Sequence, residues 1–320
     1  MKVIDIIRQA EAAGETRFAF ELLPPLKGEN INSIFDTIDA LVPFDPAYIN
    51  ITYHREDVKY VEREGGLLER RVVRKRPGTV AISAAIMARY GIETVPHLVC
   101  GGSSKFDLED MLIEMEFLGI ENVLALRGDC LKGENLFRPH PEGYAYAVDL
   151  IRHIGAMNRG EYVDCEIDNC MPTHFCVGVA GYPEKHAQAP NRATDIAYLK
   201  QKIEAGAEYV VTQMFFDNAK YFEYVADCRA AGITVPIIPG LKPFSTKRQL
   251  SLLPQTFHVD LPQALVEAVE ACRTNEEVRQ VGIRWAVQQA KELREAKVPV
   301  LHFYTMGRSD TIVQIAQEVF

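Results

Sequence analysis

The sequence predicts an α/β protein folded as a single (β/α)8 barrel of the TIM type. Short apolar runs alternate with segments of helical apolar spacing to give eight βα units, and no Pro/Gly/Ser-rich linker divides the 320 residues. The turn after the first strand reads Glu-Leu-Leu-Pro-Pro, whereas a doubly wound dinucleotide fold would need Gly-x-Gly-x-x-Gly there. That doubly wound sheet is the alternative architecture. We therefore expect one domain spanning residues 1–320, with a helix ahead of the barrel.

Eight short apolar runs are the expected barrel strands. Their nearly continuous hydrophobicity is typical of parallel strands that are buried on both faces. In chain order the predicted strands are residues 18–23, 48–53, 94–99, 122–126, 175–179, 208–213, 235–239 and 300–304.

Segments with apolar residues at helical spacing lie between these strands. The second predicted helix, for example, has Ile31, Ile34, Ile38 and Leu41 on one face. More than one helix is expected between strands seven and eight. The predicted helices are residues 1–15, 31–41, 78–90, 108–118, 146–154, 194–205, 221–231, 276–296 and 310–320.

The connection at residues 55–76 is unusually long and rich in both charges. Ordinary connections in compact α/β domains are far shorter, and long ones usually have a function. The sequence assigns it no role.

Composition describes an ordinary globular chain. With 48% hydrophobic and 25% charged residues, nothing indicates disorder, and a net charge of -9 argues against a nucleic-acid partner. The first 15 residues contain acids and lack a continuous apolar core, so they predict a helix rather than a signal peptide. No apolar run approaches the ~18 residues of a membrane span. We expect a cytoplasmic protein without a membrane partner.

The stretch 122–129, Asn-Val-Leu-Ala-Leu-Arg-Gly-Asp, carries the first chemical signal. A buried strand ends abruptly in Arg127, Gly128 and Asp129, which offer a guanidinium fork, a close backbone approach and a carboxylate. In a barrel, the carboxyl ends of the strands build the site. A solvated Arg-Asp pair in a turn is the structural alternative.

The other strand ends are also polar or aromatic, and a barrel would bring them to the same mouth. Taken singly, each could be a satisfied core or packing residue. Glu21 is the hardest to explain in that way, because burying a carboxylate between Phe20 and Leu22 is costly. Its apolar neighbours are expected to raise its proton affinity. The residues in this set are Glu21, Thr52, Tyr53, His97, Asp129, Tyr182, Gln213, Tyr304 and Arg308.

Seven scattered cysteines do not form a disulfide framework. Cys165, Cys170 and Cys176 lie close together, and Cys100 or Cys130 could join them at a metal, but the spacing fits no C-x-x-C pattern. We expect reduced thiols and no metal site.

Eight ordered motifs along the whole chain resemble the methylenetetrahydrofolate reductase family. The first four are Phe-Ala-Phe-Glu-Leu-Leu-Pro-Pro from residue 18, Ile-Thr-Tyr from 51, Pro-His-Leu-Val-Cys from 96 and Ala-Leu-Arg-Gly-Asp from 125. The others are Gly-Tyr-Pro-Glu-Lys-His from 181, Thr-Gln-Met-Phe-Phe-Asp from 212, Ile-Pro-Gly from 238 and His-Phe-Tyr-Thr from 302.

The resemblance implies FAD-dependent, ping-pong reduction of 5,10-methylenetetrahydrofolate to 5-methyltetrahydrofolate with NAD(P)H, which supplies methyl groups for methionine synthesis. Glu21 matches the general acid of the family, and Asp129 an acid beside the flavin and the pterin. Substrate contacts are implied for Asp129, Gln213, Gln249, Tyr304 and Arg308. FAD contacts are implied for Thr52, Tyr53, His97, Arg127, Gly128, Asp129, Tyr146, Ala147, Tyr182, His186, Asp195, Tyr198 and Lys202.

Some features remain open. Tyr198 and Gln201 depart from the family pattern near the AMP half of the flavin, and nicotinamide preference is undecided. Self-association into a homo-oligomer is expected, although the sequence shows no interface. The alternative functions are a pterin methyltransferase, a proline dehydrogenase-like flavoenzyme, and a folate-binding protein or subunit that needs a second chain for electrons.

Overall fold

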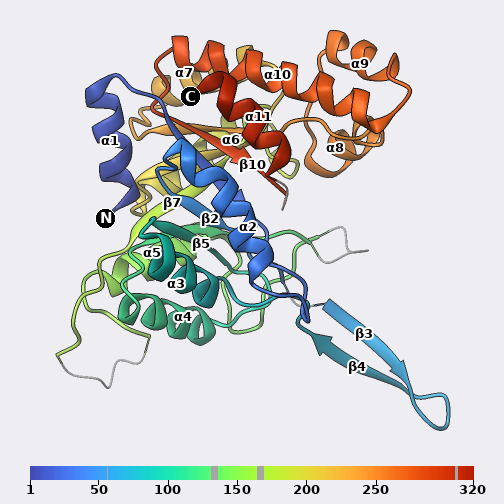
Figure 1. Cartoon of the computed structure of the whole chain (residues 1–320). Coiled ribbons are helices and arrows are strands. Elements are labelled where there is room, and N and C mark those ends of the chain that lie inside the picture. The colour runs from blue at the N-terminus through green and yellow to red at the C-terminus, as the bar shows by residue number, and fades with distance from the viewer. Residues whose placement is uncertain (56, 131–135, 164–168, 307–308) are drawn as a thin grey trace.

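The barrel predicted from the sequence is present, and it is closed. The computed structural model describes residues 1–55, 57–130, 136–163, 169–306 and 309–320. Eight parallel strands follow one another around it in the order β1-β10-β9-β8-β7-β6-β5-β2 (Figure 1). These strands are β1 (Arg17–Leu22), β2 (Ile49–Ile51), β5 (Thr94–Val99), β6 (Asn122–Leu126), β7 (Cys176–Gly181), β8 (Tyr209–Met214), β9 (Ile237–Leu241) and β10 (Val300–Tyr304).

Helices follow the strands around the outside of the barrel, as expected. Their boundaries differ from the predicted ones mainly at the first turn, where capping residues such as Ser104 and Asn191 start the helix earlier than the apolar spacing indicates. The helices are α1 (Val3–Ala13), α2 (Asn32–Leu41), α3 (Thr79–Tyr90), α4 (Lys105–Phe117), α5 (Ala147–Met157), α6 (Arg192–Glu204), α7 (Asn218–Ala230), α8 (Gln249–Phe257), α9 (Gln263–Glu270), α10 (Asn275–Glu295) and α11 (Asp310–Val319), together with a short 3-10 helix, Val42–Phe44.

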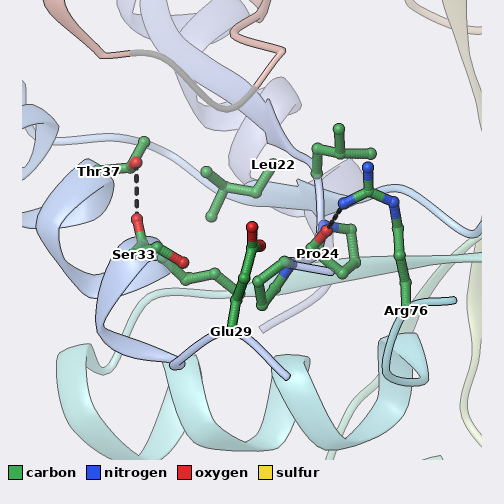
Figure 2. A pocket seen from close by; sticks show the side chains of 9 residues that line it. Leu22, Pro24, Glu29, Ser33, Thr37 and Arg76 are labelled. Carbon is green, nitrogen blue, oxygen red and sulfur yellow. Dashed lines mark hydrogen bonds between the residues drawn. The ribbon is translucent and has the colours of Figure 1, made fainter. Parts of the chain in front are cut away.

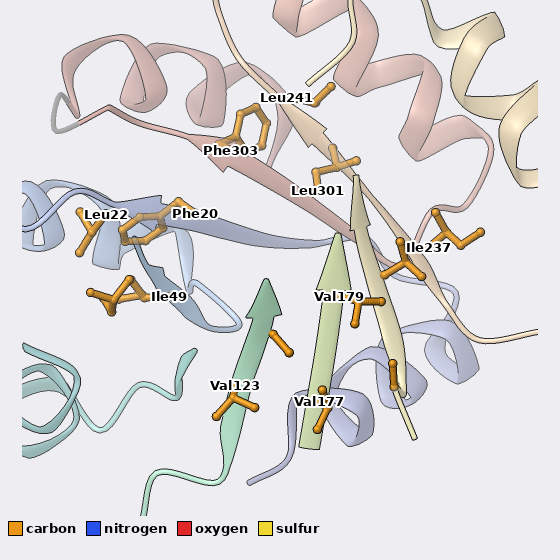
Figure 3. Packing of buried hydrophobic residues seen from close by; sticks show 14 of the residues in the cluster. Phe20, Leu22, Ile49, Val123, Val177, Val179, Ile237, Leu241, Leu301 and Phe303 are labelled. Atoms are coloured by element: carbon orange, nitrogen blue, oxygen red, sulfur yellow. The ribbon is translucent and has the colours of Figure 1, made fainter. Parts of the chain in front are cut away.

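The two faces of each strand pack into different clusters. On β1, Phe18, Phe20 and Leu22 point outward and join the large cluster between strands and helices (Figure 3). Ala19 points into the barrel, where a second cluster is closed at the amino end by α1. Glu21 has the same parity as Ala19, so its carboxylate faces the interior at the carboxyl end.

The helices between β9 and β10 pack around a separate apolar cluster, which includes Phe216, Phe244, Leu253 and Leu265. Helix α10 lies directly against the loop that leaves β9, because Gly282 has no side chain there. A Cβ at Gly282 would lie 2.0 Å from the carbonyl oxygen of Phe244. This contact fixes the loop that carries residues 242–246.

The long connection at residues 55–76 is a β-hairpin, which was not predicted. Strand β3 (Asp57–Glu62) pairs antiparallel with β4 (Leu68–Val73), and the ribbon projects away from the barrel (Figure 1). The turn uses Gly65 and Gly66, both with positive φ. The sequence did not predict these two strands because the many charged side chains of the hairpin hide the alternation of apolar and polar residues that identifies a strand. We refer to residues 57–73 as the arm.

Within the described part of the chain, no helix has the length and hydropathy that crossing a membrane requires.

The contact at Gly282 makes a stability prediction. Gly282→Ala should lower the free energy of unfolding by roughly 1–3 kcal/mol, because the new methyl group overlaps backbone that cannot move freely. Gly155→Ala on α5 is the matched control, since its Cβ would meet atoms only at 3.7 Å. That change should raise the free energy of unfolding by about 0.5–1 kcal/mol through helix propensity. Urea unfolding of both variants checks the pair, and equal effects would contradict the packing argument.

Candidate functional site

Glu21 lies at the centre of a polar cluster inside the mouth of the barrel. It pairs in register with Asn50 on β2 and Tyr304 on β10, so both neighbouring strands present side chains to it. The Thr52 hydroxyl donates to Oε1 of Glu21 at 2.8 Å. The Nε2 atoms of His97 and His302 lie 3.5 and 3.9 Å from Oε2. The predicted residues Glu21, Thr52 and His97 are therefore brought together.

The electrostatics of this cluster correct one expectation. Burial raises the pKa of Glu21, but the attraction of His302 and His97 and the Thr52 hydrogen bond lower it more, so the pKa lies below its ordinary value. Phe20 and Leu22 cannot raise it as expected, because alternation along the strand points them to the opposite face. Burial also lowers the pKa of His97, although Glu21 opposes this change.

Two buried basic groups near Glu21 were missed by the sequence reasoning. His302 is fully buried, and neither of its ring nitrogens has a hydrogen-bond partner among the described residues. Lys242 directly follows β9 with 9% of its surface exposed, and its ammonium donates to no described residue. Burial lowers the pKa of Lys242 to about 8, although the charge of Glu21 opposes this. A lysine at the end of an apolar strand was a visible signal, but the predicted strand ended at residue 239.

A second group of predicted residues surrounds the end of β6. Gly128 has φ 89°, and a Cβ there would lie 2.4 Å from a Val99 methyl group, so only glycine fits this turn. The Arg127 guanidinium donates to Oε1 of Gln188 at 2.6 Å and lies over the Phe137 ring. Asp129 is exposed beyond the strand end.

The ends of β7 and α6 supply the neighbouring residues. The Tyr182 and His186 rings meet edge to face, and the His186 backbone N–H donates to Oδ2 of Asp195 at 3.0 Å. Burial, together with Asp129 and Asp195, raises the pKa of Tyr182 to about 12. Burial and Arg127 lower the pKa of His186, which favours a neutral ring.

Lys202 on α6 is directed inward. Its Nζ atom donates to the carbonyl oxygen of Ala180 at 2.7 Å, and burial lowers its pKa to about 8 despite the attraction of Asp195. As a partner for a diphosphate, Lys202 would have to exchange that carbonyl for the ligand, and a neutral His186 would contribute a hydrogen bond rather than a charge.

The remaining predicted contacts lie around the same mouth. Tyr146 is the N-cap of α5 and makes no side-chain capping hydrogen bond, and Ala147 begins the helix. Tyr198 is exposed on α6, and Tyr53 follows β2 half-buried.

Two of the predicted substrate residues have structural partners. The Tyr304 hydroxyl donates to the carbonyl oxygen of Thr212 at 2.7 Å. The Gln249 Oε1 atom accepts from the backbone N–H groups of Ser245 and Thr246. Among the described residues, the Gln213 Oε1 atom accepts from the backbone N–H of Met214, and Arg308 lies outside those residues.

A cavity of about 170 Å³ lies beside the end of β1, between the turn 22–25 and α2 (Figure 2). Pro24, Glu29, Ser33 and Arg76 line it, and Arg76 donates to the carbonyl oxygen of Pro24. None of the residues predicted for the site lines this cavity, so we assign the candidate site to the barrel mouth.

Metal ligation is not supported by the described side chains. No group of three or more His, Cys, Asp or Glu residues among them has metal-binding geometry. Cys165, one of the three clustered cysteines, lies outside the described residues.

The sequence also matches a known protein family. The family model described as methylenetetrahydrofolate reductase matches residues 6–319. The chain belongs to the methylenetetrahydrofolate reductase family. The 5,10-methylenetetrahydrofolate reductase of Escherichia coli is 30% identical over 302 residues, which cover 94% of this chain and 90% of the bacterial one.

Longer reductases match as well. The probable methylenetetrahydrofolate reductase (NADH) of Oryza sativa is 33% identical over 98% of this chain, but the chain spans about half the length of that relative, since the match covers 50% of it. A solved structure from Clostridium thermocellum, described as binding two copies of 5-methyl-5,6,7,8-tetrahydrofolic acid, has a TM-score of 0.57 over 98% of both chains. At 12% identity, this likeness supports the barrel fold alone.

The cost of burying Lys242 at the barrel mouth can be tested by its dependence on pH. A lysine whose folded pKa is about 8, against 10.5 when unfolded, destabilises the fold wherever both states are charged. Lys242→Met should therefore raise the free energy of unfolding at pH 7 by up to roughly 3 kcal/mol, the equivalent of that shift. The gain should shrink as pH rises from 8 towards 10.5.

Urea unfolding between pH 7 and 10 measures this gain. Lys200→Met, at an exposed position on α6, is the control and should show no such trend. A loss of stability at pH 7 in Lys242→Met would mean that the ammonium has a stabilising partner.

Proposed function

We propose that this chain reduces 5,10-methylenetetrahydrofolate to 5-methyltetrahydrofolate with NAD(P)H, using FAD and ping-pong kinetics. The methyl group would then serve methionine synthesis. The observation that carries the proposal is the buried Glu21 carboxylate at the mouth of a barrel whose sequence matches the reductase family over residues 6–319. Relatives carry NADH or NADPH in their names, so the nicotinamide is left general.

Glu21 is the proposed proton donor to the folate. Opening the imidazolidine ring needs a proton on nitrogen, and Glu21 is the acidic group that the barrel directs into its mouth from β1. About 15% of its side chain is exposed, so a substrate over the mouth would remove its last contact with water. That desolvation raises the pKa of a carboxyl group and so favours proton uptake before transfer.

The residues around β6 and β7 fit a flavin. Gly128 allows the tight turn at the end of β6, and the amino end of α5, which has no side-chain cap, offers N–H groups to an anionic group such as a diphosphate. Arg127, Tyr182 and Lys202 would hold the cofactor through charge, stacking and hydrogen bonds. A bound flavin would supply the hydride relay between nicotinamide and folate.

The substrate would be held by groups across the mouth. Gln213 has an amide nitrogen that donates to no described residue, and Lys242 places a cation directly after the neighbouring strand, β9. Asp129 lies at the exposed end of β6, where it would meet the ring system of either substrate. Polar groups left unpaired in this way are suited to orienting a ligand.

Anaerobic mixing of the purified protein with NADH, and then with the folate, tests the proposal. We expect a flavin spectrum that NADH bleaches and methylenetetrahydrofolate restores. Glu21→Gln should slow the restoring step by roughly 10²-fold to 10⁴-fold, the range of a positioned general acid. Bleaching by NADH needs no protein acid and should stay within about tenfold of the wild-type rate, a change of only ~1.4 kcal/mol.

Glu29→Gln, on the exposed turn beyond β1, provides the control and should leave both steps intact. Equal damage to both steps in Glu21→Gln, or damage to neither, would show that Glu21 is structural. A protein without a flavin spectrum would contradict the cofactor assignment.

A further inference from the structure

His302 lies one layer below Glu21 in the barrel interior. It precedes Tyr304 by two residues on β10, so its side chain also points inward, and it pairs in register with Ala19 and Gly240. These two small neighbours leave space for the imidazole ring, which is fully buried. The ring belongs to the barrel core and approaches the mouth at Glu21, whose Oε2 atom lies 3.9 Å from Nε2 of His302.

The two nitrogens of the His302 ring have no hydrogen-bond partner among the described residues. An apolar ring would fill the same space without leaving two polar atoms unpaired, and buried polar groups that stay unpaired cost free energy. In the described part of the chain, a charged His302 ring has one carboxylate as its counter-ion, that of Glu21. A histidine at this position is explained if it carries a proton for that carboxylate.

His97 is the other ring beside Glu21, but its contacts favour the neutral form. The Asn50 Nδ2 atom lies 3.4 Å from Nε2 of His97, the same nitrogen that faces the carboxylate. An amide nitrogen can only donate, so this Nε2 atom accepts and carries no hydrogen. Burial also lowers the pKa of His97. His97 therefore cannot hand a proton from that nitrogen to Glu21, whereas Nε2 of His302 is free to do so.

Glu21 by itself is a poor store for a proton. Burial raises its pKa, but His302, His97 and Thr52 together hold that pKa below its ordinary value, so the carboxyl group is ionised at neutral pH. A substrate over the mouth would also cut off the small part of the side chain that reaches water. The proton that opens the folate ring must then already be inside the barrel.

We propose that His302 stores the proton that Glu21 delivers to the folate, an inference that rests on the proposed reduction. In the resting protein, the His302 imidazolium faces the Glu21 carboxylate. A bound substrate removes the remaining water from that carboxylate, and a movement of about 1 Å brings Nε2 of His302 to hydrogen-bond distance of Oε2. The proton passes from Nε2 to Oε2 and then to the folate nitrogen, which leaves a carboxylate and a neutral imidazole. After the product leaves, Glu21 takes a proton from water and returns it to His302.

Other titratable groups surround this pair. Burial lowers the pKa of Lys242 to about 8, although the charge of Glu21 opposes this change. Burial and the charge of Glu21 raise the pKa of Tyr304 well above its ordinary value, so its phenol stays neutral. The remaining groups are His54 after β2, His97 on β5, Asp129 after β6 and Tyr182 after β7. All of them are kept in the variants below, so their titration contributes to every pH profile.

The pH profile of the folate step distinguishes a shared proton from a lone acid. Two coupled groups hold their last proton at least as tightly as either holds it alone. In His302→Gln the proton is available only below the pKa of Glu21 itself, so the alkaline limb of flavin reoxidation by methylenetetrahydrofolate should move to lower pH by about one pH unit or more. The variant should approach the wild-type rate at pH 6 and be at least about tenfold slower at pH 8. Bleaching of the flavin by NADH should be unaffected.

Infrared absorption without substrate follows the Glu21 carboxyl group directly. The full chain is titrated with and without His302→Gln, and Glu21→Gln in each background identifies the carboxyl band. Because the loss of His302 removes an attraction, His302→Gln should raise the pKa of Glu21 while the alkaline limb moves down. General damage to packing would not produce these opposite shifts. His302→Asn repeats both measurements with a smaller amide.

NMR of the wild-type chain labelled at the histidine nitrogens needs no change at His302. It should show a buried imidazolium at pH 7.5 that disappears in Glu21→Gln, because a buried cation without its counter-ion is costly. The matched control is His153→Gln. The His153 ring is also buried beside a carboxylate, with Nε2 3.1 Å from Oε2 of Glu109, but it joins α5 to α4 away from the mouth. This control should change neither the pH profile nor the pKa of Glu21.

Three results would overturn the proposal. The first is an alkaline limb that His302→Gln leaves in place. The second is equal slowing of the folate step at every pH, which would make His302 a packing residue. The third is a neutral His302 ring in the wild-type protein at pH 7.5. A flavin that the folate does not reoxidise would instead contradict the proposed function, while the infrared and NMR measurements would still decide whether His302 and Glu21 share a proton.

Discussion

The parallel pairing of β1 with β10 closes the barrel and decides where the chemical groups lie. It aligns Glu21 with Tyr304, and the Thr305 hydroxyl donates to the Glu21 carbonyl oxygen at 2.6 Å across a separation of 284 residues. Without closure, β1 would be an edge strand and His302 would lie far from the carboxylate. A hydrogen-bonded ladder of this kind leaves no freedom of register, because a shift of one residue would turn Glu21 into the apolar outer layer.

The two ends of the barrel interior differ in the polarity of their side chains. At the amino end, α1 covers an apolar cluster with Ala19, Val95 and Ile238. At the carboxyl end, a carboxylate, two histidines and a lysine share a mouth with little access to water. Burying such groups is costly, and the cost is offset by the packing elsewhere in the barrel. Such a division is typical of a fold in which one face provides stability and the other carries a site.

Local backbone features set the shape of that mouth. Gly128 permits a turn that no side chain could occupy, and Gly282 allows α10 to hold the loop after β9. Gly240 has a related role, because a Cβ there would lie 2.6 Å from the ring of Tyr304. These close contacts arise between segments far apart in the sequence. Contacts of this kind need particular residues at particular positions, so the family is recognised by motifs in a fixed order along the chain. Barrels with little sequence identity share only the architecture.

The sequence by itself determined the barrel, its helices and most of the residues around the mouth, since these depend on periodicity and on the ends of apolar strands. Glu21, Thr52, His97 and the group from Arg127 to Asp129 were found in this way. Only the tertiary structure decided the lowered pKa of Glu21, the proximity of His302 and Lys242, and the projecting arm. Each depends on partners distant in sequence: a pKa reflects surrounding charges and burial, and an arm is recognised by the absence of packing around it. Neighbours in the chain specify local geometry, whereas the electric field at a buried group is created by the closed fold.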